Sequence, residues 1–214
     1  GTLYEASIRD VVADLRDSFA QLEVPAGVVM DIGGTVEEQQ EAFADILLLF
    51  GLVVLLVYIV MASQFESLRS PLIIMLTLPF AFTGVFLALF LTGQTLNLIS
   101  LIGSVMLVGI VVKNGIVLVD YTNLMRDRGL SLIQAVVVSG KSRLRPILMT
   151  TLTTALAMVP LAMGIGEGSE IWQPMGISII GGLMFSTMIT LILIPVVYTL
   201  FGANRMRREK QRAL

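Results

Sequence analysis

The chain has 214 residues, of which 56% are hydrophobic, and a formal net charge of −2. A soluble domain of this size could not cover so much apolar side chain with polar surface, so a water-soluble globular fold is excluded. Cysteine and histidine are both absent, which leaves disulfide frameworks, thiolate metal sites and an enzymatic function without support.

The first 34 residues have the composition of a soluble segment. Apolar residues recur at helical spacing between Ile8 and Phe19, which predicts an amphipathic helix. The run VVMDI, ending at Ile32, predicts a short strand closed by two glycines. Thr35, with Glu38 three residues later, is a candidate capping box for the polar helix that follows. Because no signal-peptide pattern follows the first residue, we expect the chain to be the downstream part of a longer protein.

Five long apolar runs follow, each near or above the roughly 17–25 residues that cross a bilayer core. They cover residues 46–62, 71–91, 98–121, 146–164 and 176–201. We therefore expect an all-α polytopic membrane protein with five transmembrane helices and a short N-terminal α/β segment. The expected domains are the segment 1–34 outside the membrane, a transmembrane domain over 35–204, and a basic cytoplasmic tail over 205–214.

Lysine and arginine are distributed unevenly among the links between these runs. The links after the first and third runs and the tail after the fifth carry basic residues, whereas TGQTLN and GEGSEIWQP carry none. By the positive-inside rule, this predicts a cytoplasmic C-terminus and a periplasmic N-terminus. In the long basic link, Ser131 is a candidate N-cap and Gly140 a candidate stop, which predicts a short helix at the membrane interface.

The third run contains a lysine beside an asparagine, Lys113 and Asn114, within the stretch VGIVVKNGIVLVD. A lysine near the middle of a bilayer costs about 2.5–3.5 kcal/mol on insertion scales. Three interpretations are open: the side chain snorkels to the headgroups, pairs with a buried acid for packing, or belongs to a proton or ion pathway. No run offers a carboxylate at the same depth, because Asp120 lies about 10 Å away along the helix and Asp45 and Glu66 lie at the ends of runs. The missing partner indicates helices outside this chain.

The fourth run begins with a second polar row. Arg143, Thr150 and Thr154 follow at spacings of seven and four residues and so share one helical face. A threonine in an apolar helix commonly bonds to its own backbone, which is the ordinary alternative for each hydroxyl. Four threonines within five positions weaken that alternative and favour a polar path that includes Thr150.

Three stretches together carry a family resemblance. They read VGIVVKNGIVLVDYTNLMRDRG, SRLRPILMTTLTTALAMVPLAMGIGEGSE and PMGISIIGGLMFSTMITLILIPVVYTLF. They resemble the C-terminal membrane portion of resistance–nodulation–division (RND) efflux pumps. PAGVVMDIGG and the helix after it look like the end of a periplasmic porter subdomain, so the resemblance covers essentially the whole chain. Metal exporters resemble it less in the third run, where an acidic residue would be expected, so Lys113 favours the hydrophobe and amphiphile (multidrug) branch.

The resemblance implies a proton-driven antiporter of twelve spans in two similar halves, of which this chain supplies five spans of the second half. In that family an intramembrane lysine pairs with two adjacent aspartates of the first half, and Lys113 matches that lysine. Arg143 and Thr150 match the arginine and threonine of the proton relay, with Asn114 and Asp120 as weaker members. Protonation of the aspartates would release the lysine, and a two-state helix packing would pass the change to the porter domains. No cofactor or metal is implied, and the coupling ion is the proton.

The resemblance also implies partners. These are the missing N-terminal half of the same pump, further copies in a homotrimer, a periplasmic adaptor protein, an outer-membrane channel and the lipid bilayer of a bacterial inner membrane. No nucleic acid is expected. Two alternatives stay open: RND-type export of lipid or protein, and a membrane scaffold without a transport cycle in which Lys113 serves only helix packing.

Overall fold

The computed structural model describes residue 18, residues 35–166 and residues 168–212. The regular structure in these ranges is helical, and no strand occurs among the described residues. The chain divides into two compact units, residues 1–48 and 49–214, and the arrangement given below is that of the second unit. The predicted helix and strand of the segment 1–34 fall, apart from Ser18, outside the described residues.

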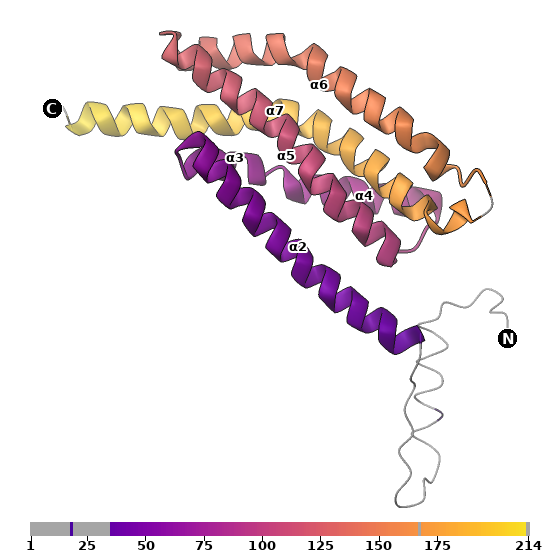
Figure 1. Ribbon diagram of the computed structural model, residues 1–214. Coiled ribbons are helices and arrows are strands. Elements are labelled where there is room, and N and C mark those ends of the chain that lie inside the picture. Colours follow the sequence, from indigo (N-terminus) through magenta and orange to yellow (C-terminus); the bar gives the residue numbers. More distant parts are fainter. Residues whose placement is uncertain (1–17, 19–34, 167, 213–214) are drawn as a thin grey trace, which may run out of the picture. The chain divides into compact units, whose positions relative to one another are not determined.

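Six α-helices and one 3-10 helix occur among the described residues from 35 to 212 (Figure 1). They are α2 (Thr35–Phe65), α3 (Arg69–Met75), α4 (Leu78–Thr92), α5 (Leu98–Asp127), α6 (Leu132–Ala162), η1 (Ser169–Ile171) and α7 (Gln173–Arg212). Five segments are long and apolar enough to cross a membrane: Glu41–Phe65, Arg69–Thr92, Leu98–Asp127, Leu132–Ala162 and Gln173–Leu200. The five predicted runs lie almost entirely inside these segments, which confirms the all-α class and the number of spans.

The second span is broken, where the sequence predicted one continuous helix. α3 ends at Met75, and α4 begins only at Leu78. Pro79 accounts for the break, because it has no N–H for the carbonyl of Met75 and its ring clashes with a straight helix at that carbonyl. The hydroxyl of Thr77 is buried and donates to the carbonyl oxygen of Ile74 at 2.7 Å. The same carbonyl oxygen also accepts the backbone N–H of Thr77 at 3.0 Å, so this acceptor beside the break is fully satisfied, as a membrane helix requires.

The predicted helix start at Ser131 is confirmed. Its hydroxyl accepts from the backbone N–H of Gln134 at 3.4 Å, and its own N–H donates to the side-chain oxygen of Gln134 at 3.3 Å. This reciprocal pair is a capping box, which satisfies two of the free donors at a helix N-terminus.

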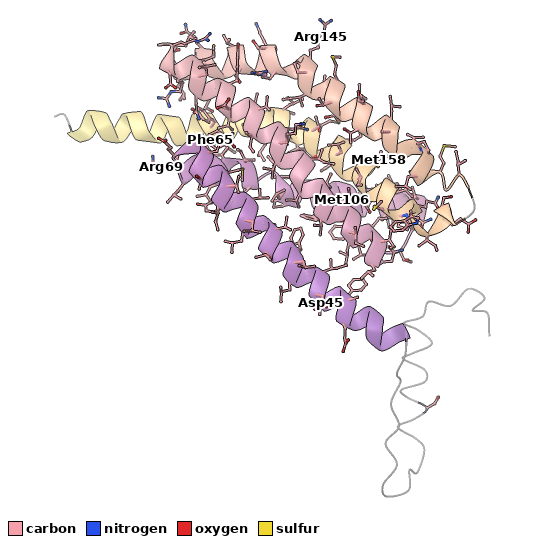
Figure 2. All side chains as sticks on the ribbon, viewed as in Figure 1. Asp45, Phe65, Arg69, Met106, Arg145 and Met158 are labelled. Carbon is pink, nitrogen blue, oxygen red and sulfur yellow. The ribbon has the colours of Figure 1, made fainter. Side chains whose placement is uncertain are left out.

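The predicted stop at Gly140 is wrong, because α6 continues through this residue to Ala162. Glycine inside a helix costs about 1 kcal/mol relative to alanine, which tertiary packing can offset. Here the hydroxyl of Ser139, fully buried, donates to the carbonyl oxygen of Leu118 on α5 at 3.0 Å. The predicted short helix is therefore the first part of α6, whose ribbon changes direction near Arg145, labelled in Figure 2, just before a proline.

α7 packs mainly against α4, α5 and α6 of the second unit, and more sparsely against α3 and η1. Its contact with α4 is made by small residues. A Cβ built on Gly181 would lie 2.1 Å from the Cβ of Ala88, and one built on Gly84 would lie 2.7 Å from the carbonyl oxygen of Gly181. Only glycine fits at such distances, so the two backbones meet as in the small-residue interfaces typical of membrane helices.

α2 contributes little to the core of the second unit. Between residues 49 and 65, Met61 alone is fully buried, whereas Leu52, Leu55 and Ile59 are exposed. Phe50 meets Phe82 of α4 edge to face, with ring centroids 5.2 Å apart. Most of this part of α2 is therefore an apolar surface suited to lipid or to further helices.

Candidate functional site

Lys113 lies in the middle of α5 with its side chain exposed. Two residues further on, Gly115 packs so closely on α3 that a Cβ there would lie 2.7 Å from Cγ2 of Ile74. Because residues two apart on a helix point in nearly opposite directions, this packing turns Lys113 away from the core. No hydrogen bond or ion pair joins Lys113 to the described part of the chain. The result is an open cation at the centre of an apolar helix.

The two weaker predicted members take different places around Lys113. Asn114 is buried, at 8% exposure, and so points into the helix packing rather than onto the open face. Asp120 is exposed and lies two helical turns, about 10 Å, further along α5 on the same face as Lys113. At that distance the carboxylate does not neutralise the lysine, so the open face carries two separate charges.

Arg143 connects α6 to α5 through an aromatic ring. Its guanidinium carbon lies 4.5 Å from the centroid of the Tyr121 ring, which is a cation–π contact. The Nε of Arg143 is buried and has no hydrogen-bond partner among the described residues. A buried charged donor without an acceptor is costly, so an acceptor is expected on an element that packs over this place.

The contact between Tyr121 and Arg143 also fixes the depth of Thr150 relative to Lys113. α5 and α6 follow one another with a short turn between them and run in opposite directions (Figure 1). Asn114 lies seven residues before Tyr121 on α5, and Thr150 lies seven residues after Arg143 on α6. Because the two helices run in opposite directions, both residues lie about 10 Å from the cation–π contact on the same side of it. Lys113 and Thr150 are therefore at comparable depth, and both are exposed.

Thr150 itself makes the ordinary bond of a helical threonine. Its hydroxyl donates to the carbonyl oxygen of Ile147 at 3.0 Å. The oxygen keeps lone pairs with which it can accept from a lysine or a water. The structure thus brings Lys113, Asp120 and Thr150 onto open helix faces, puts Arg143 against Tyr121, and buries Asn114.

A further member of the threonine run has a structural role that the sequence analysis missed. Thr151 is buried, and its hydroxyl lies 3.2 Å from the hydroxyl of Thr187 on α7. One turn along α7, the hydroxyl of Thr190 is buried without a partner among the described residues. The sequence signal was the repeat of hydroxyl residues on both helices, but their pairing depends on how α6 and α7 are aligned.

Taken together, these features define a class of protein. Five helices can span a bilayer, and the ionisable side chain of Lys113 lies at mid-length on one of them. Charged residues inside a membrane are expensive and typically mark ion or substrate pathways. The chain is thus a multi-pass membrane protein of the transporter type.

Comparison with known proteins gives the family. Residues 4–202 match the family described as AcrB/AcrD/AcrF. The chain belongs to this family of RND transporters, which are transporters of the inner membrane and not enzymes. The resemblance read from the three sequence stretches is confirmed.

Individual relatives cover almost the whole chain. It is 40% identical over 97% of its length to the multidrug resistance protein MdtC of Serratia proteamaculans, and 35% identical over 97% to the swarming motility protein SwrC of Bacillus subtilis. It is 36% identical over 85% of its length to the cobalt-zinc-cadmium resistance protein CzcA of Cupriavidus metallidurans. A crystal structure of a heavy metal efflux pump superposes on 94% of the chain with a TM-score of 0.81 and 31% identity.

The chain covers only part of each of these proteins. It spans 17–20% of the length of the three curated relatives and 20% of the heavy metal pump. Their names concern drugs, motility and metals, and the identities differ by only a few per cent. Overall similarity therefore gives the transporter family and leaves the substrate class to be argued from particular residues.

Proposed function

We propose that the chain is the C-terminal membrane portion of a proton-driven RND efflux pump that exports hydrophobic or amphiphilic compounds such as drugs. The observation that carries the proposal is Lys113. It is exposed in the middle of a spanning helix, with no hydrogen bond or ion pair to the described part of the chain. A lysine so placed requires an anionic partner on another helix, and a pair of that kind is a device for coupling proton binding to movement.

In this proposal the partner is a pair of adjacent aspartates in the N-terminal half of the same pump. When the aspartates are ionised, they hold Lys113 between them. When they take up protons the attraction is lost, and the lysine is free to move toward the hydroxyl of Thr150. Arg143 would donate the free N–H of its Nε to an acceptor of the relay. The change in helix packing would then be passed to the porter domains.

The assembly follows from the same proposal. The complete pump would be a homotrimer that acts with a periplasmic adaptor and an outer-membrane channel. The exposed apolar face of α2 is consistent with a helix that meets lipid or other helices of the pump. The proton is the coupling ion, and no cofactor is required.

Metal export is the second candidate function, favoured by the similarity to CzcA and to the heavy metal efflux pump. Against it stands Lys113, since the family resemblance leads us to expect an acidic residue in the third run of a metal exporter. Export of lipid or protein by the same membrane architecture, and a scaffold without transport, are the further alternatives.

A transport assay separates these functions. The full-length gene product would be reconstituted into liposomes with an imposed pH gradient, and the movement of an amphiphilic cationic dye, of Zn²⁺ and of protons would be followed. We expect dye transport with a counterflow of protons and no transport of Zn²⁺. Zn²⁺ transport in place of dye transport would assign the chain to metal export. A pH gradient that stays intact with both substrates would contradict drug and metal export and leave the scaffold and the export of lipid or protein.

The orientation of the spans is a separate prediction. Arg69, Arg126, Arg128 and the basic tail flank one set of helix ends, so we expect the C-terminus in the cytoplasm and the N-terminus in the periplasm. Gly93 is an exposed turn residue after α4, with a φ of 68°, and suits a reporter fusion. Fusions after Gly93 and at the C-terminus should report opposite sides of the membrane, and equal signals would contradict this topology.

A further inference from the structure

A cavity of about 670 Å³ lies at the end of the second unit where α2 ends and α3 begins. The ends of α5 and α6 and a residue of α7 complete its wall. Phe65 and Arg69, labelled in Figure 2, mark the α2–α3 side of this wall. Because the wall consists mainly of the ends of spanning helices, the cavity lies at the level where hydrocarbon gives way to headgroups.

The polar part of the cavity is positively charged. Arg69 comes from the start of α3 and Arg126 from the last turn of α5, whereas Asp127 is the one acidic residue of the lining. No ion pair joins either arginine to a residue of the described part of the chain. The cavity therefore carries a net charge of +1, with two guanidinium groups available to an external anion.

Uncharged hydrogen-bond donors line the cavity together with the two arginines. Tyr198 of α7 donates its hydroxyl hydrogen to Oδ1 of Asn123 on α5, which fixes the amide and leaves its NH₂ group as a donor. Ser67 and Ser131 also line the cavity, and each hydroxyl oxygen already accepts a backbone N–H. Each hydroxyl hydrogen is therefore available for an acceptor inside the cavity.

The rest of the wall is apolar. Ile73, Leu130 and Leu132 line it together with the ring of Phe65. A ligand that fills this space needs an anionic group for the arginines and an apolar part for these side chains. The volume lies in the usual range of about 300–1,000 Å³ for small-molecule sites.

We propose that this cavity binds the phosphate group of an anionic membrane phospholipid, with the glycerol backbone and the first part of the acyl chains against the apolar wall. Arginine binds phosphate through two parallel N–H···O bonds, which makes it the preferred residue for this group. Basic pockets between spanning helices at a membrane surface are suited to anionic headgroups in the same way. The bound lipid would link α3 to α5 at a place where no ion pair of the described residues does so.

The test is lipid binding by the full-length gene product, purified in detergent and stripped of lipid. Native mass spectrometry would measure the fraction of protein that carries added phosphatidylglycerol or, separately, phosphatidylcholine. We expect phosphatidylglycerol to bind preferentially. The double variant Arg69→Gln, Arg126→Gln should bind it about 20-fold more weakly, since each arginine near the surface contributes a few-fold. The matched control is Arg128→Gln with Arg145→Gln, which removes two exposed arginines outside the cavity and should bind as the unmodified protein does.

A second double variant and a competition with inorganic phosphate complete the test. If the glutamine pair does not yield folded protein, the pair Arg69→Lys, Arg126→Lys keeps the charges but loses the bidentate geometry, and should bind several-fold more weakly. Millimolar inorganic phosphate should leave the lipid bound. Displacement by phosphate would show a site for free phosphate and overturn the lipid assignment. Equal binding of the two lipids, or equal losses in the cavity and control variants, would overturn the proposal altogether.

Discussion

Replacement of Lys113 by methionine is expected to reduce efflux by the full-length pump to the background of cells without the pump, while expression and assembly stay near normal. Methionine keeps the length and much of the volume of the lysine stem but removes the charge. Because a lysine in the middle of a span costs about 2.5–3.5 kcal/mol on insertion, the variant span should insert at least as well. The side chain is exposed in this chain, so its loss opens no cavity in the described core.

The loss of transport would arise in the partner half. Two carboxylates left without their cation in a low-dielectric interior bind protons more tightly. They would then stay protonated through the cycle, and the pump would remain in one state. Efflux of an amphiphilic dye from cells, with the amount of membrane-embedded protein measured in parallel, separates this effect from poor expression.

Three related variants sharpen this prediction. Lys113→Arg should also fail, because a planar guanidinium cannot replace a mobile ammonium group. Thr150→Ala should weaken transport by only a few-fold, since the hydroxyl already has a backbone partner at 3.0 Å. Lys141→Met is the matched control, because Lys141 is an exposed lysine of α6 that points to nearly the opposite side of the helix from Arg143, and it should transport normally. Near-normal transport by Lys113→Met would reduce the lysine to a packing residue and favour the scaffold.

The number and approximate place of the spans could be predicted from the sequence because apolar length alone carries that information. The cap at Ser131 was predictable for a similar reason, since a capping box is a local pattern. The break before Pro79 was not predicted. A proline inside a membrane helix is often tolerated, and the local sequence does not tell whether the helix bends or breaks. Continuation through Gly140 likewise depends on a tertiary contact, the bond from Ser139 to Leu118.

The candidate site likewise has features that the sequence could predict and features that depend on tertiary packing. The isolation of Lys113 could be predicted, because it follows from the absence of a matching carboxylate in any run, and the structure places the side chain on an open face. The burial of Asn114 could not, since its direction is set by the packing of its neighbour Gly115 on Ile74. The contact of Arg143 with Tyr121 needs the alignment of two helices, which no single segment encodes. The pairing of charges with the other half of the pump stays a prediction.

The second large effect is expected at the contact between α4 and α7, through the substitution Gly181→Val. A Cβ at this position would lie 2.1 Å from the Cβ of Ala88 and 2.9 Å from the carbonyl oxygen of Gly84. Neither atom is the end of a flexible side chain, so the clash can be relieved only by moving the helices apart. Overpacking of this kind costs about 1–3 kcal/mol and sometimes more. Close backbone contact is also a main source of helix association in a bilayer, so its loss is not offset elsewhere.

We expect the purified full-length Gly181→Val variant to lose its monodisperse peak in size-exclusion chromatography, and Gly181→Ala to unfold at a clearly lower temperature. Adding Ala88→Gly to Gly181→Ala removes the nearest clash and should restore part of the loss, although the contact with the carbonyl oxygen of Gly84 remains. Gly109→Ala is the matched control, because a Cβ at Gly109 on α5 would meet no atom within 4 Å. That substitution should be neutral or slightly stabilising, since alanine favours a helix by up to about 1 kcal/mol over glycine. Equal unfolding temperatures for the Gly181→Ala and Gly109→Ala variants would show that α4 and α7 are not held together by this contact.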